Sequence, residues 1–552
     1  MKTPYQRFWL LLKPDNKEIH QVYIYAFFKG LIALSLPIGI QSIINLIQGG
    51  SVSASWMLLV FVVVLGVVMG GYMQLMQMRI TETIHQKIFT RAAFDFAYRI
   101  PRIKFEEIYR HYAPELMNRF FDVLTLQKSL SKVIIEFPTA ILQIVFGLIL
   151  LSFYHPFFIL FSLLLILLVF IIIKLTSKKG LITSLEESKF KYSLVSWLEE
   201  LARSKDSFKL AGDTNLPMVK TDERVVSYLN ARENHYQILR IQYSMLLIFK
   251  MIVVFGLLIF GGILVINQQM NIGQFVAAEI IILLVVESSE KLILNLENVF
   301  DILTSLEKLG QVTDLELDEQ SNTYSINHNI ESPINVTVNE LSFIYPARTK
   351  KVLNNISFDF KSNGIYCISG KNGSGKSTFL HLLSGLYSTN LGNVCINGFP
   401  IGNYNLSELY RVVGNGLSEE SIFEGTLLEN ITLGRDFILI EDVVWALEKV
   451  FLSDFVKSLP KGLDSPIDIS GQKLTKSLVQ RIIIARSIVN RPKLLLLEYH
   501  IDFIEEIERN KIIDFITDKS NGWTLISVSN DNYLQQKVDE IIYLCDGEIS
   551  KK

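Results

Sequence analysis

"GIYCISGKNGSGKSTFLHLLSG", Gly364 to Gly385, is the stretch that decides the fold of the second half of this 552-residue chain. An apolar run, a glycine-rich centre and a helix-spaced end predict a strand, a tight loop and a helix. The centre has the spacing of a phosphate-binding loop, in which glycines let backbone N–H groups approach phosphates and the helix N-terminus favours anions. The sequence therefore predicts nucleotide binding by nine loop residues, Gly370, Lys371, Asn372, Gly373, Ser374, Gly375, Lys376, Ser377 and Thr378.

Residues around this loop extend the prediction. In the loop itself, the Lys376 ammonium would neutralise phosphate oxygens and the Ser377 hydroxyl would bind Mg²⁺. Upstream, Tyr345 ends an alternating run, "INVTVNELSFIYP". Its ring could stack on an adenine or be an ordinary strand aromatic, and the residues alone leave both readings open. Downstream, the leucine run before Glu498 predicts a buried parallel strand that ends beside the phosphates.

The first 300 residues have a different character. The whole chain is 49% hydrophobic and only 20% charged, and its apolar residues concentrate in this half. Six stretches are long enough, or nearly so, to cross a bilayer. They run from about Val22 to Ile47, Trp56 to Met78, Val133 to Tyr154, Phe157 to Leu175, Met245 to Ile266 and Ile272 to Leu294. A net charge of −2 gives no basic surface for nucleic acid, so no nucleic-acid partner is expected.

Lysine and arginine placement predicts the orientation of these spans. The short connections "QGGSVSAS", "HP" and "NQQMN" carry no basic residue, whereas the two long inner segments carry many. Both termini and the nucleotide-binding half are therefore expected in the cytoplasm. The inner segments have helical periodicity, which predicts that the spanning helices continue past the membrane and turn at short crossing elements, for which "RHYAPELMNRF" and "SLVSWLEELARS" are the candidates.

The chain is expected to divide into an amphipathic surface helix at residues 1–20, a membrane domain at 21–313, a linker at 314–333 and a nucleotide-binding domain at 334–552. Charges inside the sixth span are a further hint, because they are costly in a bilayer. Glu287 and Lys291 are spaced to pair on one helix face, with Glu290 beside them. They mark either the cytoplasmic end of the span or the polar lining of a translocation path.

This order of six spans, two long inner segments and a phosphate-loop domain resembles the exporter class of ATP-binding cassette (ABC) transporters, of the half-transporter type. "ALSLPIGIQSIINLI" and "MNIGQFVAAE" resemble the branch with peptide and type I secretion exporters, and "FEGTLLENITLG", "LPKGLDSPID" and "VQRIIIARSIVNRPKLLLLE" match the family's cassette. The resemblance implies an α-helical six-span membrane domain followed by an α/β nucleotide-binding domain in a bacterial inner (plasma) membrane. It also implies Mg²⁺, two ATP molecules between two chains, and Tyr345 stacking on adenine.

The catalytic positions of the family are mostly substituted here. Its signature motif falls on "LTKSL", that is, Leu474, Thr475, Lys476, Ser477 and Leu478, in which both glycines are lost. The glutamine that senses Mg²⁺ falls on Ser418, and the metal-binding aspartate becomes Glu498. The carboxylate that polarises water becomes Tyr499, a neutral phenol at pH 7, and the switch histidine becomes Asn530. No catalytic residue is therefore predicted with all of its partners in place.

Three functions follow from this pattern. The first is an exporter subunit with weak or absent hydrolysis, paired with a second half-transporter chain; a heterodimer is favoured and a homodimer is the alternative. The second is a non-catalytic regulatory or structural subunit that uses ATP as a bound clamp. The third is a slow ATPase in which Glu498 suffices. The sequence does not identify the substrate, and it makes membrane lipids the only other expected partner.

Overall fold

The computed structural model describes residues 3–48, 54–109, 113–318, 332–346, 348–418, 421–467 and 474–550. The chain forms two compact units, the first made of Met1–Pro101 and Tyr112–Leu315, the second of Arg102–His111 and Glu316–Lys552. A short piece of the first inner segment thus belongs to the second unit, which the expected division at residues 314–333 did not include. Most of that expected linker lies outside the described residues.

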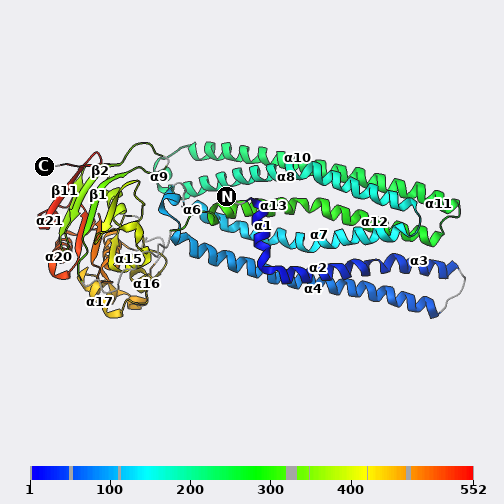
Figure 1. Ribbon diagram of the computed structural model, residues 1–552, viewed down its shortest axis with the longest axis horizontal. Coiled ribbons are helices and arrows are strands. Elements are labelled where there is room, and N and C mark those ends of the chain that lie inside the picture. The colour runs from blue at the N-terminus through cyan, green and yellow to red at the C-terminus, as the bar shows by residue number, and fades with distance from the viewer. Residues whose placement is uncertain are drawn as a thin grey trace. The chain divides into compact units, whose positions relative to one another are not determined.

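The first unit is entirely helical in its described part (Figure 1). Six of its helical stretches are long and apolar enough to cross a membrane, which confirms the six-span prediction; they cover Pro4–Gln48, Ala54–Arg102, Glu115–Ser152, Phe157–Arg203, Leu216–Ile266 and Ile272–Thr313. The individual helices are α1 (Pro4–Leu12), η1 (Lys13–Asp15), α2 (Asn16–Ala33), α3 (Ser35–Gln48), α4 (Ala54–Arg99), η2 (Ile100–Arg102), α6 (Ala113–Asn118), η3 (Arg119–Phe121), α7 (Asp122–Ser152), α8 (Phe157–Arg203), α9 (Lys205–Leu210), α10 (Leu216–Gly256), the π-helical η4 (Leu257–Gly261), α11 (Gly262–Ile266), α12 (Ile272–Leu294) and α13 (Leu296–Thr313).

The longest helices exceed the thickness of a bilayer, as the sequence predicts. α4 has 46 residues and α8 has 47, and at 1.5 Å per residue each is roughly 70 Å long, against a hydrocarbon core of about 30 Å. The second crossing element was predicted wrongly: "SLVSWLEELARS" continues α8 to Arg203, and the chain turns at α9. That segment has strong helix formers and no glycine or proline to end the helix. The first candidate overlaps α6, and its residues 110–112 lie outside the described part.

Helix packing in this unit brings distant spans together. α2 packs against α4 and α7, α12 packs against α7 and α3, and α10 runs beside α8. The start of α12 is fixed locally by a capping box, in which the Asn271 side chain accepts from the Gln274 N–H at 2.7 Å and the Gln274 side chain accepts from the Asn271 N–H at 2.9 Å. Side chains of α12 such as Ile281 and Val285 are fully buried. The helices α2, α4 and α7 therefore pack against one another, and α12 packs against α7.

The second unit contains a six-stranded sheet in the order β12-β11-β3-β10-β9-β6, parallel except for the edge pair β11–β12. Its strands are β3 (Ile365–Gly370), β6 (Val413–Gly416), β9 (Leu494–Glu498), β10 (Thr524–Val528), β11 (Glu540–Cys545) and β12 (Glu548–Ser550). The leucines of β9 are buried, as predicted for a strand covered on both faces. Because β3 and β9 are parallel within one sheet, the loops after them meet at one edge.

Helices and a second sheet complete this unit. The second sheet is antiparallel, in the order β2-β1-β4-β5, with β1 (Val336–Phe343), β2 (Leu353–Phe360), β4 (Leu391–Ile396) and β5 (Phe399–Pro400). A two-stranded pair joins β7 (Gly425–Thr426) to β8 (Pro466–Ile467). The helices are α5 (Phe105–Tyr109), α14 (Lys376–Leu383), η5 (Ile401–Asn403), α15 (Leu406–Val412), α16 (Leu427–Thr432), α17 (Ile440–Lys449), α18 (Ser453–Ser458), η6 (Gly462–Asp464), α19 (Lys476–Ile488), α20 (Glu506–Ile516), η7 (Lys519–Asn521) and α21 (Asn532–Lys537).

The short helix α5 is tied to the second unit by backbone hydrogen bonds. The Lys104 N–H donates to the Glu316 carbonyl at 2.9 Å, and the Asp318 N–H donates to the Arg102 carbonyl at 2.7 Å. The Lys104 ammonium also pairs with the Glu316 carboxylate at 2.9 Å. These contacts hold α5 beside the chain that leads into the nucleotide-binding domain.

Candidate nucleotide site

The phosphate loop joins β3 to α14, and its glycines are required by its shape. Gly370, Gly373 and Gly375 have φ values of +146°, +82° and +99°. A Cβ on Gly370 would lie 2.2 Å from the Leu544 carbonyl oxygen, and one on Gly375 would lie 2.7 Å from Leu353. Only glycine fits both the backbone conformation and the space at these two positions. The loop therefore keeps its backbone N–H groups near the N-terminus of α14, where an anion is favoured.

The polar side chains of the loop fit a phosphate ligand. The Lys376 ammonium donates to the carbonyls of Gly370 and Lys371, both at 2.8 Å, and burial lowers the pKa of its ammonium. The Ser374 hydroxyl is buried and has no hydrogen-bond partner in the described part of the chain. Lys376 is itself buried. A buried hydroxyl without a partner and a buried cation in one loop form the arrangement that a bound phosphate would complete.

Glu498 ends β9 beside this loop and is 1% exposed. Its Oε2 accepts from the Ser418 N–H at 3.0 Å and lies 3.4 Å from His381 Nε2. Burial alone would raise the pKa of this carboxyl, but hydrogen bonds from His381, Ser377 and Ser418 outweigh burial and lower the pKa to about 2. The structure thus brings Ser377 and Glu498 together and keeps Glu498 ionised.

The second oxygen of Glu498 is the one that suits a metal ion. Its Oε1 is buried and has no hydrogen-bond partner among the described residues. A carboxylate and a hydroxyl are hard oxygen ligands of the kind that Mg²⁺ binds next to phosphates. Ser377 and Glu498 are therefore the residues that would hold Mg²⁺, which would neutralise charge on the phosphate oxygens.

Tyr499 follows Glu498 in an unusual conformation. Its φ is +52°, and its N–H donates to the Val528 carbonyl at 2.9 Å. The ring packs partly buried against the core, and burial raises the pKa of its phenol above the usual value of 10. The phenol is therefore neutral at pH 7 and cannot accept a proton from water as a carboxylate would.

The remaining predicted positions lie on separate elements. Asn530 is exposed in the turn after β10. Ser418 reaches Glu498 through its backbone N–H, a contact that does not need a long side chain.

In the signature region, Thr475 caps α19, since its hydroxyl accepts from the Leu478 N–H at 3.3 Å. Lys476 is exposed over the ring of Phe503 at 5.5 Å. Leu474 and Leu478 pack against the core, and Ser477 is half-buried at the start of α19.

Tyr345 lies beside the loop and is covered by a residue that sequence reasoning missed. Its hydroxyl is 2.8 Å from the Thr378 hydroxyl. The ring of Tyr109, from α5, stacks on the Tyr345 ring with centroids 4.8 Å apart and planes 16° from parallel. Tyr387 meets the Tyr345 ring edge-on at 5.4 Å. His381 was also missed; its one signal was a titratable residue within the apolar run "FLHLL" that ends α14.

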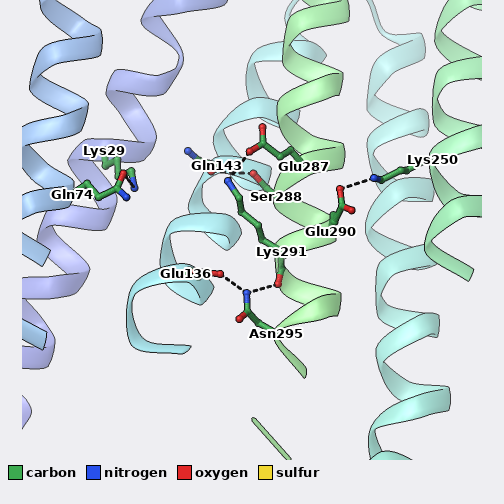
Figure 2. Close-up of polar contacts among 10 residues, drawn as sticks. All are labelled: Lys29, Gln74, Glu136, Gln143, Lys250, Glu287, Ser288, Glu290, Lys291 and Asn295. Atoms are coloured by element: carbon green, nitrogen blue, oxygen red, sulfur yellow. Dashed lines mark hydrogen bonds and ion pairs between the residues drawn. The ribbon is translucent and has the colours of Figure 1, made fainter. Parts of the chain in front are cut away.

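The charged residues of the sixth span are paired in the first unit (Figure 2). Lys291 donates to Glu287 at 2.7 Å within α12, as the four-residue spacing predicts. Glu290 instead accepts from Lys250 of α10 at 2.5 Å. Farther along, the Asn295 amide donates to Glu136 of α7, and Ser288 donates to Gln143 at 3.0 Å. Such hydrogen-bonded and ion-paired side chains are consistent both with the cytoplasmic end of a span and with the polar lining of a translocation path.

The chain thus combines a helical unit with six candidate membrane spans in its described part and a phosphate-loop sheet domain, which is the architecture of ATP-driven transporters. Two family models match the chain: the ABC transporter transmembrane region over residues 22–288 and the ABC transporter domain over residues 353–498. The chain belongs to the ABC transporters.

Known proteins agree with this assignment. A putative export ATP-binding/permease protein of Rickettsia bellii is 29% identical over 248 residues, 45% of this chain and 43% of that protein. An ATP-dependent lipid A-core flippase of Photobacterium profundum is 26% identical over 45% of this chain and 42% of that protein. The chain therefore matches less than half the length of these relatives. A solved bacterial Atm1-family ABC exporter with ATP bound has a TM-score of 0.84 at 16% identity, covering 97% of this chain and 94% of that one, a likeness that shows the exporter fold alone.

Proposed function

We propose that this chain is an exporter subunit that binds ATP and Mg²⁺ and hydrolyses ATP weakly or not at all. The observation that carries the proposal is the contrast within one site. The phosphate loop and the Glu498 carboxylate suit a nucleotide and its metal ion, whereas the adjacent position holds a neutral, core-packed Tyr499. Binding is retained where the general base is missing.

ATP would then act through binding energy. A ligand that binds one conformation better than another shifts the equilibrium by its differential affinity, with no bond broken. In this family, the phosphate loop of one chain meets the signature residues of a second chain. We therefore propose a second half-transporter as partner, with a heterodimer favoured and a homodimer as the alternative. The membrane orientation follows the basic residues, with both termini in the cytoplasm.

The substituted signature also supports a second candidate. Thr475 is engaged in capping α19, and Lys476 and Ser477 replace the glycines that would let the backbone approach a phosphate. A partner's ATP would therefore be poorly held by this chain. That favours a non-catalytic regulatory subunit, in which ATP is a clamp on a closed state.

The test is ATP binding and turnover by the purified full-length chain, alone and with any co-purifying half-transporter. We expect the lone chain to bind ATP with Mg²⁺ and to release phosphate at the background rate. Lys376→Ala should abolish binding, while Lys371→Ala, an exposed residue of the same loop, should weaken it less. Phosphate release by the lone chain that Lys376→Ala removes would overturn the proposal, and failure to bind ATP would overturn both candidates.

A further inference from the structure

A cavity of about 590 Å³ lies among α2, α4, α7 and α12 of the first unit. This volume is in the range of small-molecule sites. Its charged lining residues are Lys29, Lys132, Lys291, Glu82 and Glu136. Amide, hydroxyl and imidazole groups and three apolar side chains make up the rest of the lining. All lie near the cytoplasmic ends of the spans predicted from the sequence. The cavity is therefore a polar chamber expected at the inner boundary of the membrane.

The lysines at this depth differ in their partners (Figure 2). Lys250 and Lys291 each form an ion pair with a glutamate, at 2.5 and 2.7 Å. Within the part of the chain that the structure describes, the Lys29 ammonium donates a hydrogen bond only to the neutral Gln74 amide oxygen, at 3.2 Å. For Lys132, no hydrogen bond or ion pair occurs within the described ranges. Within the described residues, the half-buried Lys29 and the exposed Lys132 thus have no ion-paired carboxylate of the kind that Lys250 and Lys291 have, although Glu136 lies close enough to act on Lys29 through space.

The acidic residues of the cavity are already engaged by internal donors. Glu136 accepts from the Asn295 amide. Glu82 accepts from the Gln86 amide at 3.1 Å and lies 3.7 Å from His85. Because Lys29 can only donate, the Gln74 carbonyl faces Lys29, and the Gln74 NH₂ remains available as a further donor. The wall therefore has unused donors on Lys29, Lys132 and the Gln74 NH₂, beside two carboxylates that already accept hydrogen bonds from the protein.

We infer that this cavity binds the anionic group of a ligand, a phosphate or carboxylate, between Lys29 and Lys132. The inference rests on the proposed exporter function and names the chemical class of its substrate. A bound anion would supply the charge that both ammonium groups lack, and the Gln74 NH₂ would donate to a second oxygen. The anion is the headgroup of an inner-leaflet lipid or a soluble phosphate, which share this chemistry.

The test measures anion binding by the full-length chain in nanodiscs without nucleotide. Spin-labelled phosphatidylglycerol in a phosphatidylcholine bilayer reports the lipid source, and inorganic phosphate reports the soluble source. Two charge-assisted contacts are lost in Lys29→Gln/Lys132→Gln, so we expect the association constant to fall about tenfold or more. Lys29→Arg/Lys132→Arg should retain binding. Lys17→Gln/Lys128→Gln, on the same two helices but away from the cavity, should match the wild type.

Each outcome decides the inference. Lysine-dependent preference for phosphatidylglycerol supports a lipid headgroup, and lysine-dependent binding of inorganic phosphate alone supports a soluble anion. A wild-type chain that binds neither probe above phosphatidylcholine, or binding that survives the double glutamine variant, overturns it. ATP binding is measured on the same preparation. Lost ATP binding with intact anion binding would overturn the proposed function only, and the reverse would overturn this inference only.

Discussion

Glu498 and Tyr499 are neighbours with opposite environments. The Glu498 carboxylate is buried but surrounded by donors, so the pKa of its carboxyl falls to about 2. The Tyr499 phenol lies against apolar side chains, and burial raises its pKa. One peptide bond therefore separates a group suited to hold a metal ion from a group that cannot serve as a base.

Restoring the carboxylate at position 499 should not restore the reaction. A positioned base alone contributes about 10²–10⁴-fold in rate, but Asn530 and the signature residues Lys476 and Ser477 would still be substituted. We expect Tyr499→Glu to leave phosphate release at background, as measured with a coupled phosphate assay. Tyr499→Phe is the matched control and should behave identically. Rapid, Lys376-dependent turnover by Tyr499→Glu would contradict this expectation.

At the scale of elements, the position of α5 determines whether an adenine can stack on the Tyr345 ring. It belongs to the segment between two membrane spans, yet it folds with the nucleotide-binding unit. Its Tyr109 ring occupies one face of Tyr345 at 4.8 Å, too close for a base to enter between them. An adenine that stacks on this face must displace α5, which would link nucleotide occupancy to the inner segment.

Removing the Tyr109 ring should therefore strengthen ATP binding. An aromatic pair is worth about 0.5–1.5 kcal/mol, so we expect Tyr109→Ala to lower the Kd for ATP by roughly two- to tenfold. Titration calorimetry on the full-length chain measures the change. Tyr109→Phe keeps the stacked ring and should leave the Kd unchanged. Weaker binding by the alanine variant would mean that Tyr109 supports the nucleotide instead of competing with it.

At the scale of the whole molecule, the membrane orientation is the property open to direct measurement. The turn after α11 is exposed at Gln269, and the turn between α9 and α10 is exposed at Asp213. In a variant with its three cysteines replaced, we expect Gln269→Cys to react with an impermeant maleimide added outside intact cells. Asp213→Cys should react only after the membrane is opened. The opposite pattern would show that the basic segments face outward.

The sequence predicted the features that depend on short-range pattern. Six apolar stretches predicted the six long helices, because crossing a bilayer requires a run of apolar residues wherever it occurs. The buried β9 strand followed from its leucines. The prediction for "SLVSWLEELARS" was wrong, because this segment consists of helix formers with no signal that ends a helix. It was assigned to a crossing element and is the end of α8. The roles of the loop residues, Ser418 and Asn530 stay predictions.

What the sequence determined by itself is the class of protein: apolar runs fix the spans, and the glycine spacing of residues 370–378 specifies the phosphate loop. Only the tertiary structure decided which distant groups meet. Tyr109 covers Tyr345, His381 approaches Glu498, and Lys29 and Lys132 share a cavity while Lys250 and Lys291 are paired. Helical and strand periodicities determine which face of an element is buried, but the partner of each side chain depends on how whole elements pack.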